Sequence, residues 1–192
     1  MSTSQKAPYI CGALTELDPK HRDEVKEFYV RLGDACRVAI GVRGFVPHEH
    51  YDPIKNASAK NTVVYSAERR IVTEETSVLI VYAIEPSWGA GIEVGWANEH
   101  HVPILVLVPE DKKVSRLLTG GPMVSAVISV RDYDHAVLEL KAWLLDFNES
   151  RQKRAEADER MHRWEMASED PCNKHPLRCE TLDSIKGKAA SG

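Results

Sequence analysis

The sequence has few cysteines and no long apolar run, and both absences limit what kind of protein it encodes. Its four cysteines show no dense spacing, so we expect free thiols in a reducing cytoplasm rather than a disulfide framework. The opening MSTSQKAP lacks the basic start and apolar stretch of a secretory signal, and no apolar run approaches the ~20 residues of a membrane helix. These features predict a cytoplasmic protein with no membrane partner.

An excess of positive charge is also missing. The formal net charge of the 192 residues is −4, with 25 lysines and arginines against 29 aspartates and glutamates. Proteins that bind nucleic acids usually show a broad basic face, so we expect no nucleic-acid partner, although one small basic pocket remains compatible with this charge. The hydrophobic content of 43% and the length are sufficient for one sizeable core.

Apolar runs alternate with periodic segments along most of the chain. Short apolar runs bounded by turn residues predict strands, and apolar positions spaced near 3.6 residues predict amphipathic helices. The expected strands are 8–14, 44–53, 77–84, 103–108 and 125–130. The expected helices are 18–39, 62–76, 90–100, 112–120 and 134–147.

The order of these segments predicts the fold class. Strands that alternate with helices, and that are apolar throughout rather than at every second residue, favour a parallel sheet covered on both faces. We expect an α/β fold with a flavodoxin-like, doubly wound sheet of five parallel strands and right-handed crossovers. In such sheets ligands bind beyond the carboxyl ends of the strands.

The composition changes after Asn148. Residues 149–170 are highly charged with few apolar positions, and the remainder has little pattern. We therefore expect a domain over 1–148, followed over 149–192 by a charged helical extension and a loose tail that is solvated or faces a partner.

The segment Pro-Ser-Trp-Gly-Ala-Gly separates the expected strand 77–84 from the next helix. Gly89 and Gly91 let a ligand approach the backbone because no Cβ intervenes, and Ser87 adds a hydroxyl. The helix start presents unpaired N–H groups and a partial positive charge. The combination favours a cradle for a phosphate or for sugar hydroxyls, although many strand–turn–helix units carry two glycines.

Glu93 follows this turn and has two interpretations. In the first it lies in the first helical turn and complements the helix dipole, as half of a capping arrangement. In the second it is a nucleophile, because carboxylates attack sugars through an oxocarbenium-like transition state and form a glycosyl-enzyme intermediate. The residue alone does not decide between them.

Three motifs together resemble a known family. YICGAL at 9–14, PSWGAGIEVGWA at 86–97 and KVSRLLTGG at 113–121 are similar to motifs of the nucleoside 2-deoxyribosyltransferase-like family, which includes the 2'-deoxynucleoside 5'-phosphate N-hydrolases. The likeness runs from Pro8 to Leu145 in the same order. It implies the family's doubly wound, five-stranded fold.

The resemblance also implies roles for single residues. Glu93 matches the family nucleophile, and Tyr9 matches a tyrosine that hydrogen-bonds near it. Gly12 and its neighbours Ala13 and Leu14 match the loop around the sugar and the phosphate.

Further matches concern the phosphate and the assembly. Ser87 and Gly89 match the turn that contacts the phosphate in the hydrolases. Ser115 matches a serine that, in the hydrolases, reaches the site of a neighbouring subunit, which implies a homodimer.

Glu68 is a departure from the family pattern. The family has an aspartate that handles the proton on the leaving base, and Glu68 takes its place with a spacing to the next strand that is one residue longer. If Glu68 does not reach the base, cleavage would be slow and the fold would serve to bind. The loop GALTEL is less basic than in the hydrolases, which leaves a nucleoside and a nucleotide as alternatives.

His48 and His50 alternate near the end of the expected second strand, so they would share a face. No partner set with metal-ligand spacing accompanies them, and we expect no metal. They either line the sugar or base pocket or lie in a solvated loop. Trp88 either stacks on a nucleobase or covers the core.

The leading functional prediction is N-glycosidic bond cleavage or base exchange on a nucleoside or nucleoside 5'-monophosphate, through a covalent intermediate on Glu93. The partner would be this small molecule, and no cofactor is expected. The alternative is a catalytically weak, nucleotide-sensing or partner-binding module on the same fold. A phosphoribohydrolase ranks lower, because the turn lacks that group's paired glycines and threonine.

Overall fold

Four parallel strands form one sheet in the order β1-β2-β3-β4 in the computed structural model, which describes residues 5–15, 17–52, 55–56 and 58–168. The elements, in chain order, are β1 (Ala7–Gly12), α1 (Pro19–Ile40), α2 (His48–Tyr51), α3 (Asn61–Arg70), the π-helical turn η1 (Ile71–Glu75), β2 (Thr76–Tyr82), α4 (Trp88–Glu99), β3 (Ile104–Pro109), α5 (Arg116–Thr119), β4 (Val124–Val130) and α6 (Tyr133–Ser168). Cys172 and Cys179 lie outside the described residues.

The expected second strand, 44–53, is reduced to a single bridge. Phe45 pairs in parallel with Tyr9 on the free side of β1, through hydrogen bonds to Pro8 and Ile10. The ladder cannot continue past Pro47, because proline has no amide hydrogen. The prediction of five strands is therefore wrong in its count, although Phe45 lies where a doubly wound sheet would have its outer strand.

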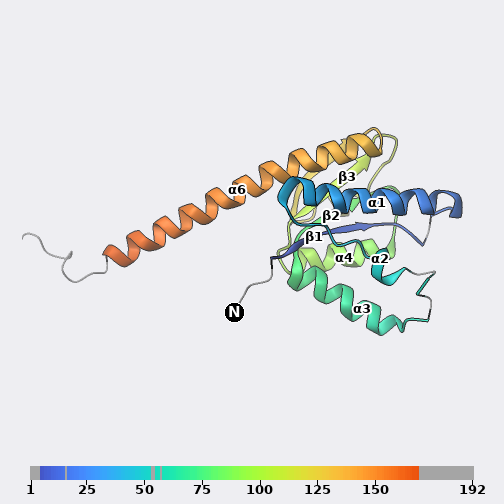
Figure 1. Cartoon of the computed structure of the whole chain (residues 1–192), viewed down its shortest axis with the longest axis horizontal. Coiled ribbons are helices and arrows are strands. Elements are labelled where there is room, and N and C mark those ends of the chain that lie inside the picture. The colour runs from blue at the N-terminus through green and yellow to red at the C-terminus, as the bar shows by residue number, and fades with distance from the viewer. Residues whose placement is uncertain (1–4, 16, 53–54, 57, 169–192) are drawn as a thin grey trace, which may run out of the picture. The chain divides into compact units, whose positions relative to one another are not determined.

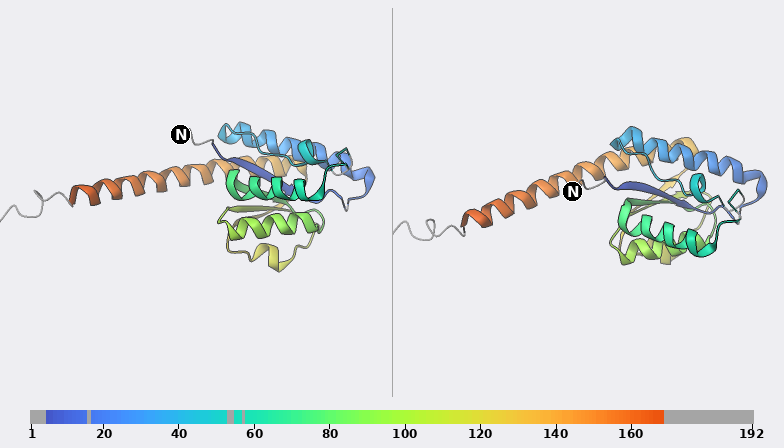
Figure 2. Two further views of the ribbon diagram at one scale, coloured as in Figure 1. Left: turned by 90° about the horizontal axis from the view of Figure 1, so that it is seen from below. Right: turned by 60° about the horizontal axis from the view of Figure 1, so that its bottom comes forward.

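Helices cover both faces of the sheet. Helix α1 and the first part of α6 lie on one face, where Phe28 of α1 stacks on Tyr133 of α6 with ring centroids 4.2 Å apart. Helices α3 and α4 lie on the other face (Figures 1 and 2). All described residues of β3 are buried, as the prediction of a sheet covered on both faces requires.

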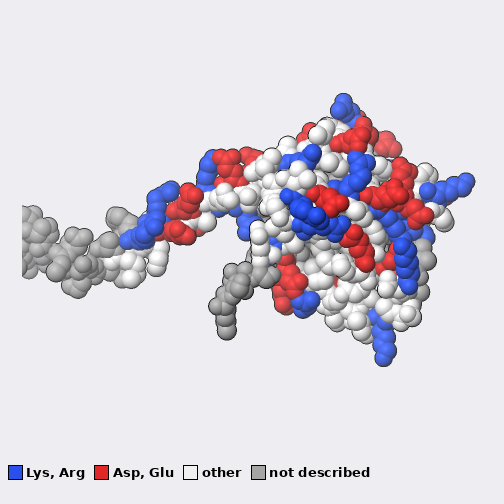
Figure 3. Space-filling view, viewed as in Figure 1, with Lys and Arg blue, Asp and Glu red and all other residues white. Residues whose placement is uncertain are grey.

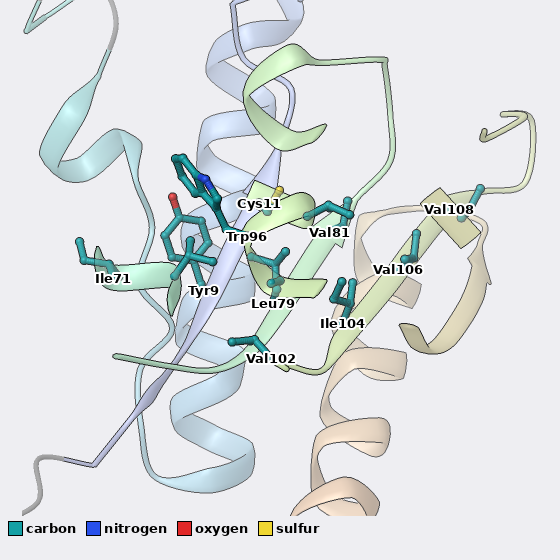
Figure 4. Packing of buried hydrophobic residues seen from close by; sticks show 13 residues of the cluster. Tyr9, Cys11, Ile71, Leu79, Val81, Trp96, Val102, Ile104, Val106 and Val108 are labelled. Atoms are coloured by element: carbon teal, nitrogen blue, oxygen red, sulfur yellow. The ribbon is translucent and has the colours of Figure 1, made fainter. Parts of the chain in front are cut away.

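The core on the α4 side contains alternate residues of the central strands. Tyr9 and Cys11 of β1 point to this face, since residues two apart on a strand share a side. They pack beside Leu79 of β2 and Trp96 of α4 (Figure 4). Tyr9 is thereby held in the buried core.

Helix α1 begins and ends as its sequence predicts. The carboxylate of Asp18 caps it by accepting a hydrogen bond from the amide of Lys20, and Pro19 occupies the first turn. Gly41 ends it in the left-handed conformation, with φ 76°. This helix carries Lys26 and Tyr29, which contact the region of the candidate site.

The chain divides into two compact units, residues 1–146 and 147–192. Leu144 is the last buried residue of the first unit, and the described side chains from Glu149 to Arg163 are all exposed. The domain boundary expected after Asn148 stays a prediction. No helix within the described part of the chain has the length and apolarity to cross a membrane. On the face shown in Figure 3, acidic and basic side chains are interspersed.

Candidate active site

The site is built around the start of α4. Ser87 has an extended backbone and caps the helix, with its Oγ accepting from the amide of Ala90 at 3.5 Å. A Cβ placed on Gly91 would meet no atom within 4 Å, and one on Gly89 would meet only Ser87 Oγ at 3.8 Å. Packing within the chain would therefore tolerate a side chain at either position. The two glycines are consistent with a ligand that comes close to the backbone here.

Glu93 is buried against Tyr9. Its side chain is 8% exposed, and the hydroxyl of Tyr9 donates a hydrogen bond to its Oε1 at 2.5 Å. Glu93 comes six residues after the cap Ser87, so it lies in the second turn of α4. The sequence had suggested the first turn. Glu93 is therefore too far along the helix to take part in a capping box, and the capping interpretation is wrong.

Glu93 and Glu68 line the same cavity. We name the carboxylate cavity the space of about 340 Å³ that is lined by, among others, Tyr51, Asp52, Asn56, Asn61, Tyr65, Glu68, Gly89, Glu93 and Trp96. Its walls come from α3, α4 and the segment that joins α2 to α3. Two carboxyl groups thus face one space large enough for a sugar and a base.

The one-residue excess after Glu68 has a structural counterpart in η1. This π-helical turn lies directly between α3 and β2, and each of its hydrogen bonds spans one residue more than in an α-helix. Ile71 and Val72 remain buried, and the carbonyl of Ile71 accepts a hydrogen bond from Thr76 Oγ1 at 2.9 Å. The wider turn accommodates the extra residue while Glu68 still faces the carboxylate cavity.

Burial raises the pKa of both carboxyl groups. Burial raises the pKa of Glu68 to about 7, and the nearby charge of Glu93 adds to the rise. Burial also raises the pKa of Glu93, while hydrogen bonds from Cys11 and Tyr9 oppose the rise by stabilising its ionised form. At neutral pH Glu68 can therefore hold a proton, as a general acid requires, while the two hydrogen bonds to Glu93 favour its ionised form.

Cys11 is a contact of Glu93 that the sequence did not reveal. It lies in β1 and is buried. Its Sγ also lies 3.9 Å from the carbonyl oxygen of Ala90, on the helix that carries Glu93. The available signal was its spacing of two residues from Tyr9, which places both on one face of β1.

A second space lies on the other side of the α4 start. We name the turn cavity the space of about 370 Å³ that is lined by, among others, Gly12, Ala13, Tyr82, Glu85, Ser87, Gly91, Lys112, Lys113, Ser115 and Leu117. The expected site residues are thus divided between two cavities. Gly12, Ala13, Ser87, Gly91 and Ser115 line the turn cavity, while Glu68, Gly89 and Glu93 line the carboxylate cavity.

Five expected residues lie apart from the described lining of both cavities: Tyr9, which contacts Glu93 from behind that lining, and Leu14, His48, His50 and Trp88. His48 and His50 lie in the short helix α2 and not at a strand end, since the chain turns after Pro47. His50 stacks on Phe45 with centroids 4.8 Å apart. Trp88 is 87% exposed, so it does not cover the core.

Some residues that line the carboxylate cavity were not predicted from the sequence as site residues. They are Tyr51, Asp52, Asn56, Asn61, Tyr65 and Trp96.

The fold and the site define a doubly wound α/β protein with paired carboxyl groups in a cavity beside a glycine-rich helix start. Neither the protein-family models nor the curated proteins contain a match to the chain. Solved structures do match it. The solution structure of BlsM has a TM-score of 0.58 at 17% identity, over 74% of this chain and 91% of that one.

Two further solved structures are a CMP N-glycosidase and a deoxyribosyltransferase. The CMP N-glycosidase BcmB of Clostridium botulinum has a TM-score of 0.51 at 15% identity, over 72% of this chain and 99% of that one. A 2-deoxyribosyltransferase of Bacillus psychrosaccharolyticus has a TM-score of 0.49 at 14% identity, over 68% and 90%. At these identities the likeness of BlsM and BcmB shows that the fold is shared, and this agrees with the fold implied by the sequence motifs.

Proposed function

We propose that the protein cleaves or exchanges the N-glycosidic bond of a nucleoside or nucleotide, with Glu93 as the nucleophile. The observation that carries the proposal is the pairing of Glu93 with Glu68 in one cavity, with Tyr9 donating a hydrogen bond to Glu93 at 2.5 Å. A buried carboxylate held by a donor and facing a second carboxyl group of raised pKa is the equipment that glycosyl transfer needs.

The residues divide the reaction between them. The ionised carboxylate of Glu93 attacks the anomeric carbon of the sugar, and the bond from that carbon to the base nitrogen breaks with its electron pair going to the base. Glu68, in its acid form, gives its proton to the departing base. Water or a second base then attacks the anomeric carbon, gives a proton to the Glu68 carboxylate and releases Glu93 as a carboxylate. Tyr9 holds the nucleophile in position throughout.

The solved neighbours are compatible with this chemistry. One of them is a CMP N-glycosidase, and it shares the doubly wound fold with this chain. The finer parts of the proposal, which are the covalent intermediate, the homodimer with Ser115 at its contact and the location in the cytoplasm, come from the sequence. Sedimentation analysis of the purified chain tests the homodimer.

The experiment is release of free base from a panel of nucleosides and nucleoside 5'-monophosphates, with and without an acceptor base. We expect release from at least one substrate, and its loss in Glu93→Gln, which keeps the size of the side chain and removes its charge. The matched control is Glu99→Gln, an exposed glutamate at the end of the same helix, which should keep full activity. Equal activity of Glu93→Gln and the unmodified protein would contradict the proposal.

The binding-module alternative loses its main support in the structure. This alternative depended on the possibility that Glu68 does not reach the site. Glu68 in fact lines the carboxylate cavity. Calorimetry gives the deciding outcome: tight nucleotide binding, with no base released from any substrate and no change in affinity in Glu93→Gln, would favour this alternative over the enzyme.

A further inference from the structure

The carboxylate cavity and the turn cavity differ in charge. The described lining of the carboxylate cavity contains three acidic residues, Asp52, Glu68 and Glu93, and no lysine or arginine. The turn cavity contains Lys112 and Lys113 with one acidic residue, Glu85. The charged side chains of the first space are therefore all acidic, whereas those of the second are mostly basic.

The lysine that lies near the carboxylate cavity is already paired with an aspartate. Lys26 forms an ion pair with Asp52 at 2.6 Å, and both side chains are mostly buried, at 13% and 3% exposure. Within the part of the chain that the structure describes, Glu68 and Glu93 have no such cationic partner. The negative charge at the reacting carboxyl groups is thus left to face the ligand.

The other polar groups of the cavity are neutral. Asn56 and Asn61 contribute amides, and Tyr51 and Tyr65 contribute hydroxyls. Amides and hydroxyls bind base edges and sugar hydroxyls, but they do not neutralise a phosphate. A 5'-phosphate carries a charge of about −1.5 to −2 at pH 7, and the ionised carboxylate of Glu93, which has no cationic partner among the described residues, repels it in a partly buried site.

We infer that the carboxylate cavity takes unphosphorylated nucleosides and discriminates against their 5'-monophosphates. The inference rests on the proposed function and names the substrate class of the same site. A phosphate could gain a cation only by extending past Gly89 into the turn cavity. There Lys112 is held by Glu85 at 2.6 Å, which leaves Lys113 as the exposed lysine of that lining.

The first test compares each nucleoside with its own 5'-monophosphate. We expect kcat/KM to be at least about tenfold higher for the nucleoside. The Coulomb repulsion between two close charges in a partly buried site is larger than the free energy that corresponds to a tenfold ratio. Equal or higher kcat/KM for the monophosphate overturns the inference and leaves the proposed function intact. If that preference then disappears in Lys113→Ala, the phosphate occupies the turn cavity.

A second test separates the inference from turnover. Calorimetry on Glu93→Gln, with nucleoside and monophosphate as probes, measures the discrimination in a variant that cannot form the glycosyl intermediate. Glu93→Gln removes the repelling charge of Glu93 and leaves only that of Glu68 in its ionised fraction, so the preference for the nucleoside should shrink. If the unmodified protein releases base from no substrate, that result counts against the proposed function. If Glu93→Gln binds the monophosphate more tightly than the nucleoside, that result counts against the inference alone.

A charge introduced at the cavity wall gives the sharpest comparison. Asn61 is exposed, begins α3 and lines the carboxylate cavity, so Asn61→Lys brings a cation to the site without burying it. We expect it to raise kcat/KM for the monophosphate relative to the nucleoside by about tenfold. Ser125→Lys, at an exposed position of β4 outside this lining, is the matched control and should leave the ratio unchanged. An unchanged ratio in Asn61→Lys, with unfolding like that of the unmodified protein, overturns the inference.

Discussion

At the scale of single residues, the contact between Tyr9 and Glu93 carries the most functional weight. Tyr9→Phe keeps the buried ring and removes the donor, and a hydrogen bond to a charged group contributes about 1.5–3 kcal/mol. We expect kcat/KM for base release to fall about 10- to 100-fold. The acidic limb of the pH profile should move to higher pH, since Tyr9 lowers the pKa of Glu93. Tyr133→Phe, on the other face of the sheet, is the control.

Glu68 determines the opposite limb of that profile. As a proton donor it must be protonated, and burial raises its pKa to about 7, so activity should decline as the pH rises through about 7.

The same rise in the pKa of Glu68 affects the stability of the fold. Ionising Glu68 costs the folded state free energy, beginning above the ordinary pKa of 4.5 and complete above about 7. Glu68→Gln should therefore abolish the basic limb and increase the free energy of unfolding at pH 8 but not at pH 4. A basic limb that persists in this variant would assign it to another group.

Gly12 and Gly91 make a matched pair for testing which glycines serve the fold. A Cβ on Gly12 would lie 2.1 Å from the hydroxyl oxygen of Tyr29, which donates a hydrogen bond to the carbonyl of Ala13. Gly12→Ala should reduce the free energy of unfolding by about 1–3 kcal/mol in urea denaturation. Gly91→Ala meets open space in a helix and should increase it by up to about 1 kcal/mol. Loss of stability in Gly91→Ala would show that this glycine serves packing.

At the scale of elements, η1 decides whether Glu68 reaches the site. Deleting Glu74, an exposed residue of the π-turn, should convert the turn to α-helix and rotate α3 by about 100° relative to β2. We expect Glu68 to leave the cavity, with loss of base release and of the basic limb near pH 7. Glu74→Ala keeps the chain length and should keep both. Full activity in the deletion variant, with its basic limb intact, would show that η1 does not set the position of Glu68.

At the scale of the whole molecule, the folded unit and the extension should separate. Every described side chain from Glu149 to Arg163 is exposed, and the last buried residue is Leu144. A chain that ends at Asn148 should unfold within about 3 °C of the full chain and keep its base-release activity, because the removed side chains that the structure describes from Glu149 to Arg163 are exposed. A larger loss of thermal stability in scanning calorimetry, or loss of activity, would assign residues 149–192 to the fold or to the site.

The sequence by itself determined the class of fold and the identity of the central residues. Apolar runs such as 103–108 are buried strands because a sheet covered on both faces has no polar side. The cap at Asp18 and the glycine at 41 fix the ends of α1 through local backbone chemistry. The contact between Tyr9 and Glu93 was implied by the resemblance of the motifs around them to a known family, and Tyr9 does donate a hydrogen bond to a buried Glu93.

Only the tertiary structure decided how these residues meet. The reduction of the second strand to Phe45 depends on a ladder that ends at Pro47, and the position of Glu68 depends on a π-helical turn. The division into two cavities, with carboxyl groups in one and lysines in the other, joins residues that are far apart in sequence. Periodicity describes one element at a time, whereas the pKa of a carboxyl group depends on burial and on charges that other elements bring close to it.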